Sequence, residues 1–315
     1  MAVTLAQAAV LSQNTLARGV METFVIESSV LDRIPLMTIQ GNAYAYTKEQ
    51  TLPGVAFRSV NEAYTESTGT FVQATESLVI LGGDADVDRF IVQTRGNLQD
   101  QRAAQTRAKV KSAAYKFQDT FINGDVTVDT KSFDGLKKRL TGGQVISSGT
   151  NGAPIVGNGG TDAMTFLDRL DDLYGAVAGG PDVVYANATI RSRIRAAARR
   201  VGGTEMVVDD INGKRELMWN GVPIVDIGTK ADGSLIIPQT EVQGSSSVAS
   251  SIYAVKFGND ETDQAVTGLT NGGVQVYDLG EVSDKPVYRT RLEFYCGLAT
   301  FGGQAAARLT GVLAS

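Results

Sequence analysis

The stretch VDRFIVQTRGNLQDQRAAQTRAKVKSAAYKFQDTF, residues 87–121, decides the fold class of this chain. Apolar residues recur in it at spacings of three and four, as at Val110, Ala114 and Phe117, which is the pattern of one helix face. A helix of this length extends for about 50 Å, whereas helices of globular domains average about 12 residues. The pattern therefore predicts an elongated structural helix, in which Gly96 marks a bend or a break into two helices.

Three acids, Asp84, Asp86 and Asp88, lie at or just before the start of this helix, at the spacing that opens a calcium-binding loop. Such a loop also needs glycine at its sixth position and glutamate at its twelfth, and here those positions hold Arg89 and Arg95. A metal site is therefore excluded. We interpret the acids as residues that complement the positive end of the helix dipole.

Residues 40–81, further towards the N-terminus, have the pattern of a long hairpin. Residues 43–46 alternate alanine with tyrosine, and Pro53, Gly54 and Gly69 supply turn residues. The segment is polar for a buried sheet, and a two-stranded ribbon is only marginally stable in water on its own. We therefore expect the hairpin to lie on the body of its own subunit or on another chain.

The rest of the chain mixes helices and strands. Residues 3–27 have helical spacing and predict an N-terminal arm, and Asn187 is placed to cap a helix. A Gly-rich excursion covers 141–160, a helix 161–178 and a Ser-rich loop 244–251. Strand-like runs occur at 182–185, 222–227, 235–237, 252–257, 274–279 and 287–296, and a final Gly-rich stretch closes in 308–313. This order predicts an α+β fold with interleaved domains.

Composition excludes the commonest enzyme chemistries. With 315 residues, 43% of them hydrophobic and 20% charged, the chain has the composition of a soluble globular protein. It contains no histidine, which excludes imidazole as base, nucleophile or zinc ligand. Its single cysteine, Cys296, cannot close a disulfide within the chain or build a CxxC metal site. No apolar stretch is long enough to span a membrane, and the N-terminus is a poor signal peptide, so we expect a cytoplasmic product.

The remaining candidate motifs for a ligand or a reaction are incomplete. The glycines at 157–160 do not complete GxGxxG, and Gly213-Lys214 lacks the following Ser or Thr of a phosphate-binding loop. The acids at 168–172 lie opposite leucines, as on any solvated amphipathic helix. An enzyme that uses carboxylate and lysine chemistry is the rival function from another class, and no constellation supports it. We expect no catalytic residue, cofactor or metal.

Two basic clusters are the strongest remaining candidates for binding. Residues 89–121 hold seven Lys or Arg against two acids, and residues 186–200 hold five arginines and no acid. Arg191, Arg195 and Arg199 share one helical face, and we call these three residues the arginine stripe.

Two functions are open for the arginine stripe. It contacts phosphates, or it pairs with acids of the same or a neighbouring subunit, for which the candidates are Glu205, Asp209, Asp210 and Glu216. The chain holds 29 basic and 34 acidic residues, and a net charge of −5 argues against a surface that binds nucleic acid everywhere. We therefore favour pairing between subunits.

Taken in order, these elements resemble the Hong Kong ninety-seven type of major capsid protein, found in tailed bacteriophages. PDVVYANATIRSRIRAAA (181–198) resembles the family's strand that runs through a polar corner into a helix, and NGVPIVDIG (220–228) its Gly-x-Pro strand. IYAVKFGND (252–260) resembles its short apolar strand, and YRTRLEFYCGLATFGGQAAARLTG (288–311) its closing strand. Their order, after a hairpin and a long helix, extends the resemblance over nearly the whole chain.

The resemblance implies five parts. They are an N-terminal arm (1–39), an extended β-hairpin loop (40–81), a peripheral domain with a spine helix (82–160), an axial domain (161–268) and returning strands of the peripheral domain (269–315). It also implies a structural protein, not an enzyme, that self-assembles through pentamers and hexamers into an icosahedral shell enclosing double-stranded DNA. The alternative in the same fold is an encapsulin-like bacterial compartment that encloses a cargo enzyme.

The resemblance further implies the partners and the location. The main partner is the chain itself, joined by scaffolding, portal and decoration proteins and by packaged double-stranded DNA in weak non-specific contact, with no membrane. The location is the virion capsid, assembled in the host cytoplasm. Subunit-interface residues are expected in the hairpin and the axial section: Tyr44, Tyr46, Lys48, Phe57, Arg58, Tyr64, Arg191, Arg195, Arg199, Asp209 and Asp210. A polar ribbon gains hydrogen-bond partners when it lies on an adjacent subunit.

Overall fold

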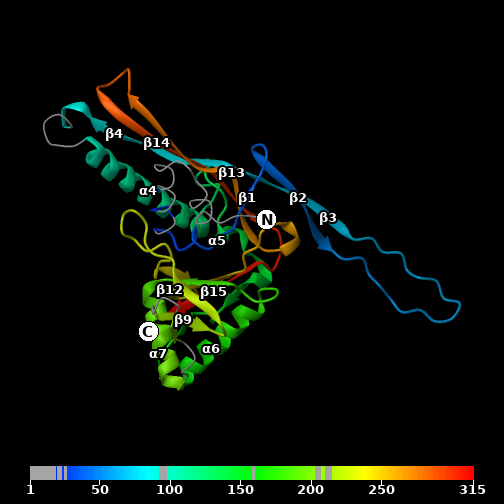
Figure 1. Cartoon of the computed structure of the whole chain (residues 1–315). Helices are drawn as coiled ribbons and strands as arrows, with labels where there is room; N and C mark the ends of the chain where they lie inside the picture. Colours follow the sequence, from blue (N-terminus) through cyan, green and yellow to red (C-terminus); the bar gives the residue numbers. More distant parts are fainter. Residues whose placement is uncertain are drawn as a thin grey trace.

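The computed structural model describes residues 19, 23, 24, 27–91, 98–157, 160–202, 207–209 and 215–315. Figure 1 shows a body made of two sheet-and-helix parts, with a slender two-stranded hairpin that projects from it. Most of the predicted N-terminal arm lies outside the described residues. Phe24 and the stretch 30–34 are described, and their apolar side chains are buried in the core.

A four-stranded sheet and the long helix form the first part of the body. In spatial order its strands are β1 (Leu36–Thr38), β13 (Val266–Glu281), β14 (Val287–Thr300) and β4 (Val79–Asp88). The helix α4 (Leu98–Asn123) packs on this sheet through the apolar face that the sequence predicts. Phe117 on α4 contacts Phe294 on β14, with ring centroids 5.9 Å apart.

The long helix begins later than the sequence predicts. Residues 87–88 belong to β4, residues 89–91 form a helical turn, and α4 begins at Leu98. Residues 92–97, with the predicted break at Gly96, lie outside the described part of the chain. The physical reason is that all ten residues of β4 pair with β14, so the sheet hydrogen bonds outweigh helix propensity there.

A nine-stranded sheet forms the second part of the body. Its main path is β5 (Val145–Ser147), β15 (Ala306–Leu313), β12 (Ser246–Val255), β7 (Val183–Ala186), β10 (Val222–Asp226), β9 (Arg215–Trp219) and β8 (Val207–Asp209), while β11 (Glu241–Gln243) pairs with β12 and β6 (Ala153–Pro154) with β15. The helices α6 (Gly160–Gly175) and α7 (Ala188–Val201) pack against it. The predicted cap of α7 is confirmed, because Asn187 accepts a hydrogen bond from the Ile190 N–H at 2.8 Å.

Strand pairing moves three of the predicted domain boundaries. β15 is not a returning strand of the four-stranded sheet, because it pairs with β12 and β5 in the other sheet. β5 and β6 join it there, although the sequence places them in the peripheral range 82–160. β13 starts inside the predicted axial range but lies in the four-stranded sheet. β15 is largely buried on both faces, so its sequence does not alternate between apolar and polar residues. Such a strand carries no local signal of the sheet to which it belongs.

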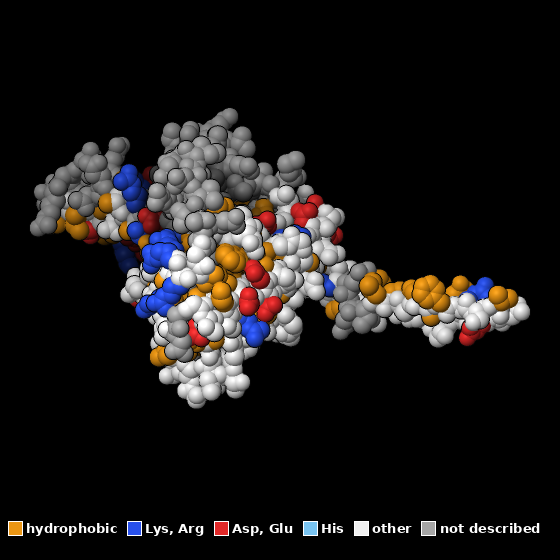
Figure 2. All heavy atoms as spheres, turned by 90° about the horizontal axis from the view of Figure 1, so that it is seen from below, with side chains coloured by type: hydrophobic (Ala, Val, Ile, Leu, Met, Phe, Trp, Pro, Cys, Tyr) orange, Lys and Arg blue, Asp and Glu red, His pale blue; other side chains and the backbone are white. Residues whose placement is uncertain are grey.

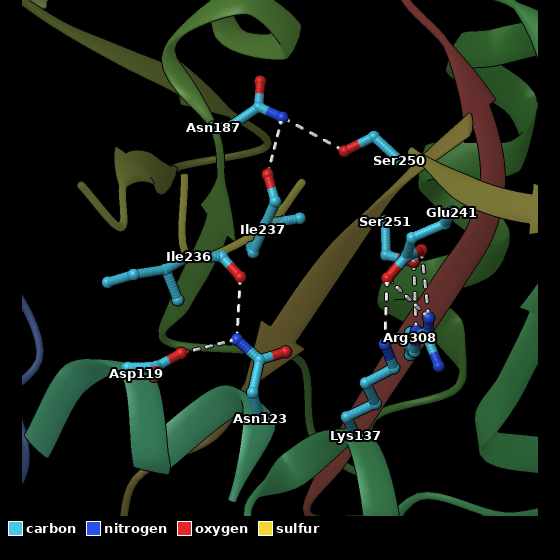
Figure 3. Close-up of polar contacts among 10 residues, drawn as sticks. All are labelled: Asp119, Asn123, Lys137, Asn187, Ile236, Ile237, Glu241, Ser250, Ser251 and Arg308. Atoms are coloured by element: carbon cyan, nitrogen blue, oxygen red, sulfur yellow. Dashed lines mark hydrogen bonds and ion pairs between the residues drawn. The ribbon is translucent and has the colours of Figure 1, made fainter. Parts of the chain in front are cut away.

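The Ser-rich stretch 244–251 is mostly strand rather than loop, because β12 starts at Ser246. Its serines can enter the sheet interior because their hydroxyl groups are hydrogen-bonded. Ser250 Oγ accepts from the Asn187 amide at 3.1 Å, and Ser251 Oγ donates to the Glu241 carboxylate (Figure 3). The polar residues that predict a loop are thus satisfied inside the protein.

Two asparagines connect the two parts of the body through the segment 227–240 (Figure 3). Asn123, the last residue of α4, donates its side-chain amide to the Ile236 carbonyl at 2.7 Å. Asn187 donates to the Ile237 carbonyl at 3.1 Å. The carbonyls of two neighbouring buried residues, Ile236 and Ile237, are therefore held by the end of the long helix and by the residue that caps α7.

The predicted hairpin is confirmed. β2 (Ala43–Thr51) and β3 (Thr70–Ser77) pair with each other in a separate two-stranded sheet. The loop between them, residues 52–69, is exposed almost throughout. Smaller elements complete the described chain: α5 (Leu136–Arg139) and the short 3-10 helices η1 (Gly142–Gln144) and η2 (Glu261–Asp263).

Candidate subunit-interaction surfaces

The hairpin root is fixed to the body by aromatic packing. The Tyr46 ring meets Phe301 edge-on, with centroids 4.9 Å apart, and its hydroxyl donates to the Thr300 carbonyl at 3.1 Å. Tyr44 is half-buried against the same phenylalanine, at 6.1 Å. Tyr46 is only 4% exposed, so its predicted interface role is wrong: the residue anchors the hairpin within its own subunit.

A bidentate ion pair reinforces the root. The Arg139 guanidinium on α5 donates to both Glu76 carboxylate oxygens on β3, at 2.5 and 2.7 Å. Both side chains are less than one-fifth exposed. Because water solvates them poorly, the two direct hydrogen bonds are needed to offset the cost of burying the charges. Burial, and next the Glu76 carboxylate, raise the pKa of Tyr46 to about 12, so its hydroxyl stays a hydrogen-bond donor at neutral pH.

Lys48 lies at the boundary between the root and the free part of the hairpin. Its ammonium group sits 5.2 Å from the centre of the Tyr46 ring. Burial lowers the pKa of Lys48, while Glu76 opposes that shift. The side chain is half-buried in its own subunit, so part of its surface remains for a partner.

The hairpin tip exposes apolar side chains to solvent. Phe57 is fully exposed, and Tyr64 is 70% exposed. Others in the hairpin are Leu52, Val55, Val60, Phe71 and Val72. Figure 2 shows this apolar material along much of the projecting arm. Such a row on a thin arm cannot be buried by the arm itself, and exposed apolar surface of this kind typically marks a protein contact.

The tip is nevertheless locally ordered by polar contacts. Arg58 stacks on the Tyr64 ring at 5.0 Å and donates to the carbonyls of Ser59 and Glu62. The Glu62 carboxylate accepts from the Ser59 N–H at 2.9 Å, and Asn61 adopts the left-handed conformation that a tight turn uses. Of the predicted interface residues, Phe57, Arg58 and Tyr64 thus lie together at the tip.

The arginine stripe lies on α7, at the far end of the second sheet. Arg195 and Arg199 are exposed, and neither has an ion-pair partner among the residues that the structure describes. Arg191 is half-buried. Asp209 ends β8, and its side chain lies outside the described set, as does the whole of Asp210. The predicted pairing of the stripe with these acids therefore stays a prediction.

The acids at the start of the predicted helix form a cross-strand ladder instead. Asp86 on β4 stands opposite Arg289 on β14, and Asp84 stands opposite Arg291. Both pairs are bidentate, with N–O distances of 2.6 to 2.9 Å. The interpretation as helix-dipole residues is wrong for Asp84 and Asp86, because they lie on a strand. The alternation of Arg289 and Arg291 with the same period of two was the available signal.

Each arginine of the ladder holds the pKa of its aspartate below the ordinary value. The strongest cause is the side-chain hydrogen bond, from Arg291 to Asp84 and from Arg289 to Asp86. The carboxylates and guanidinium groups of the ladder thus neutralise one another within one subunit.

The described residues contain no group of acids and cysteine arranged to hold a metal ion. Within the same residues, no helix is both long and apolar enough to cross a membrane. Cys296 is buried on β14, and burial raises the pKa of its thiol, so it is a poor nucleophile.

Comparison with solved structures shows the fold family of this chain. The holo-SrpI encapsulin complex from Synechococcus elongatus PCC 7942 matches with a TM-score of 0.62 and 19% identity, over 89% of this chain and 86% of that one. The capsid of the native GTA particle matches with a TM-score of 0.60 and 15% identity, over 91% and 90%. The structure from Mycobacterium phage Adephagia gives 0.58 and 12%, over 91% and 90%. These matches show that the fold is the Hong Kong ninety-seven type that capsids and encapsulins share.

The family comparison makes the class more specific. Residues 13–167 match the family model described as Major capsid protein GP7. This match covers the arm from residue 13, the hairpin, the long helix and the start of the second part of the body. It confirms the resemblance to the major capsid proteins of tailed bacteriophages. No curated protein matches the chain significantly.

Proposed function

We propose that this chain self-assembles through pentamers and hexamers into a closed icosahedral shell around double-stranded DNA. The observation that supports assembly most directly is the hairpin tip, where Phe57 is fully exposed and Val55 is 95% exposed. Burying one large apolar side chain contributes about 1.5–3 kcal/mol, and the tip has several that its own subunit leaves in water. A second copy of the chain supplies the surface that covers them.

The geometry favours rings rather than isolated pairs. The hairpin tip and the body are different surfaces of one chain, so a tip that contacts a neighbour's body makes a head-to-tail contact. Head-to-tail contacts close into rings when the rotation between copies is suitable. Rings of five and six copies then build the shell.

Charge supports a container with weak affinity for its contents. A net charge of −5 limits attraction between the shell and packaged DNA, so contact with DNA is weak and non-specific in this proposal. The proposed location is the virion capsid, assembled in the host cytoplasm. Scaffolding, portal and decoration proteins are proposed partners, and the proposed role involves no catalysis.

An encapsulin-like compartment around a cargo enzyme is the second candidate. The match to the SrpI encapsulin supports it only as far as the shared fold. The two candidates differ in contents, because one shell encloses nucleic acid and the other encloses protein.

Electron microscopy of the purified protein tests assembly. We expect closed shells from the wild-type chain and folded but unassembled subunits when residues 52–69 are replaced by Asn-Gly, a two-residue hairpin turn. This cut keeps in place Glu76, which pairs with Arg139 of the body, and Lys48, which lies over the Tyr46 ring at the hairpin root. The matched control changes Val242 and Val248, exposed valines outside the hairpin, to serine, and should leave shells intact. Wild-type protein that stays monomeric at high concentration contradicts the proposal.

A further inference from the structure

An apolar cavity opens between α4 and the start of β4, and the subunit itself leaves it unfilled. It measures about 160 Å³. Phe117, Phe133 and Cys296 contribute buried side chains to its wall, and the exposed Ile80 lines it as well. A cavity of roughly 150 Å³ with apolar walls is large enough to bind benzene. The space therefore fits one aromatic ring.

The lining of the cavity also includes charged groups with excess positive charge. Lys116 and Lys131 are exposed lining residues, and their ammonium groups have no ion-pair partner in the described part of the chain. The one acid in the lining, Asp129, already accepts a hydrogen bond from the Lys131 backbone N–H at 3.1 Å. The occupant should therefore combine an aromatic ring with a negative charge.

The hairpin tip has both properties. Phe57 offers a fully exposed ring. The same loop contains two acids, Glu62 and Glu66, and one base, Arg58, which is engaged by Tyr64 and by backbone carbonyls. Glu66 has no polar partner among the described residues, so its charge is available to a neighbour.

A subunit cannot fill its own cavity with its own tip. The cavity begins at Val79, directly after β3 ends at Ser77, whereas the tip lies at the opposite end of that strand. Eight residues of strand separate the two by roughly 26 Å. Figure 1 shows the hairpin pointing away from the body. The ring must come from a second copy.

We propose that the Phe57 ring of one copy inserts into the cavity between α4 and β4 of the next copy, with Glu66 close to Lys116 and Lys131. This inference rests on the proposed shell function, and it names the surface that receives the hairpin. The contact joins the tip of one chain to the body of another, so it propagates around a ring.

Photo-cross-linking tests the position of the ring directly. The chain is made with p-benzoylphenylalanine at position 57, assembled with an equal amount of isotope-labelled chain, irradiated and digested. We expect cross-links between labelled and unlabelled peptides, with the acceptor peptide containing residues 79–81, 116–120 or 129–133. Cross-links within one chain, or to any other part of a neighbour, overturn the proposal. The substitution is at a fully exposed position, so folding should not be affected.

A charge swap provides the second test. The double change Lys116→Glu and Lys131→Glu should lower the yield of shells about tenfold or more, and Glu66→Lys in the same chain should restore part of it. Lys285→Glu, in the exposed turn between β13 and β14, is the matched control and should have little effect. Equal yields from the Lys116/Lys131 variant and the wild type overturn the proposal.

Different results would contradict the proposed shell function and the proposed contact of Phe57 with the cavity. Wild-type protein that forms no shell contradicts the proposed function, and the inference falls with it. Wild-type shells in which position 57 cross-links outside the cavity leave the proposed function standing and remove only this contact.

Discussion

At the scale of single residues, the Arg139–Glu76 pair decides how firmly the hairpin is joined to the body. The two groups come from α5 and β3 and meet in a bidentate pair that solvent reaches poorly. Arg139 also donates to the Asp134 carbonyl at 2.6 Å, which fixes the guanidinium in place. Removing one partner would leave the other charge poorly solvated and unpaired.

We predict that Arg139→Ala lowers the free energy of unfolding of the unassembled subunit by roughly 2–3 kcal/mol. The substitution removes two charge-assisted hydrogen bonds. It also leaves the Glu76 carboxylate at the hairpin root without its positively charged partner. Urea unfolding followed by circular dichroism measures the change. Arg193→Ala, at an exposed position on α7, is the control and should stay within about 0.5 kcal/mol of wild type. A similar small effect for both variants would contradict the prediction.

Sequence pattern identified the hairpin residues but not which of them turn inwards. Tyr44 and Tyr46 are two apart, so they share one face of the strand, and that face meets Phe301 of the same chain. Phe301 is distant in sequence and follows β14, so no local pattern could reveal the contact. Phe57 and Tyr64 have no such partner, and they remain available for a neighbour.

At the scale of elements, the ladder between β4 and β14 ties the edge strand to the sheet. Arg289 also reaches Asp84 at 3.4 Å, so the two pairs form one network. The folded-state pKa values of Asp84 and Asp86 lie below the ordinary aspartate value. Groups with a depressed pKa stabilise the fold above the unfolded-state pKa, and that stability is lost as the pH falls through the folded-state pKa.

We therefore predict that wild-type subunits lose stability below about pH 4, in part through this ladder. The double variant Asp84→Asn and Asp86→Asn should be less stable than wild type at neutral pH, and the difference between the two should shrink as the pH falls. Urea unfolding at a series of pH values measures it. Asp168→Asn, at an exposed site on α6, is the control. A difference that stays constant down to pH 3 would refute the role of the ladder.

The start of α7 is the second element whose stability depends on one side chain. Asn187 is fully buried, caps the helix and donates to Ile237 and Ser250. We predict that Asn187→Ala costs roughly 2–3 kcal/mol, because the cap and two donors are lost together. Asn187→Ser keeps an oxygen for the cap and should be about 1 kcal/mol less damaging. Denaturant unfolding separates the variants, and equal values for both would show that the cap contributes little.

The elements that could be predicted are those with a clear period. The helical face of α4 and the cap of α7 were accessible from spacing alone. The sheet of β15 and the first half of β12 were not, because burial on both faces and hydrogen-bonded serines remove the alternation; only the run 252–257 was predicted as strand. The start of α4 was missed because β4 pairs with a strand some 200 residues later in the chain, Asp88 opposite Val287.

At the scale of the whole molecule, the two parts of the body present different charge to their surroundings. Around the β4–β14 ladder, acids and bases neutralise one another within the subunit. On α7, Arg195 and Arg199 point to solvent without an ion-pair partner in the described chain. Unbalanced charge at one end of an elongated subunit is where a neighbour or a phosphate would be recognised.

The last prediction separates these two partners of the arginine stripe. If the stripe pairs with acids across a subunit interface, Arg195→Glu with Arg199→Glu should block ring formation, because like charges then face one another. Asp209→Arg in the same chain should restore part of the assembly. Arg193→Glu makes the same kind of change on another face of α7 and serves as the control. Sedimentation and electron microscopy report assembly, and nuclease-protected DNA reports packaging. Normal shells that retain less DNA would assign the stripe to phosphate contact instead, because a repelled phosphate leaves the contacts between subunits untouched.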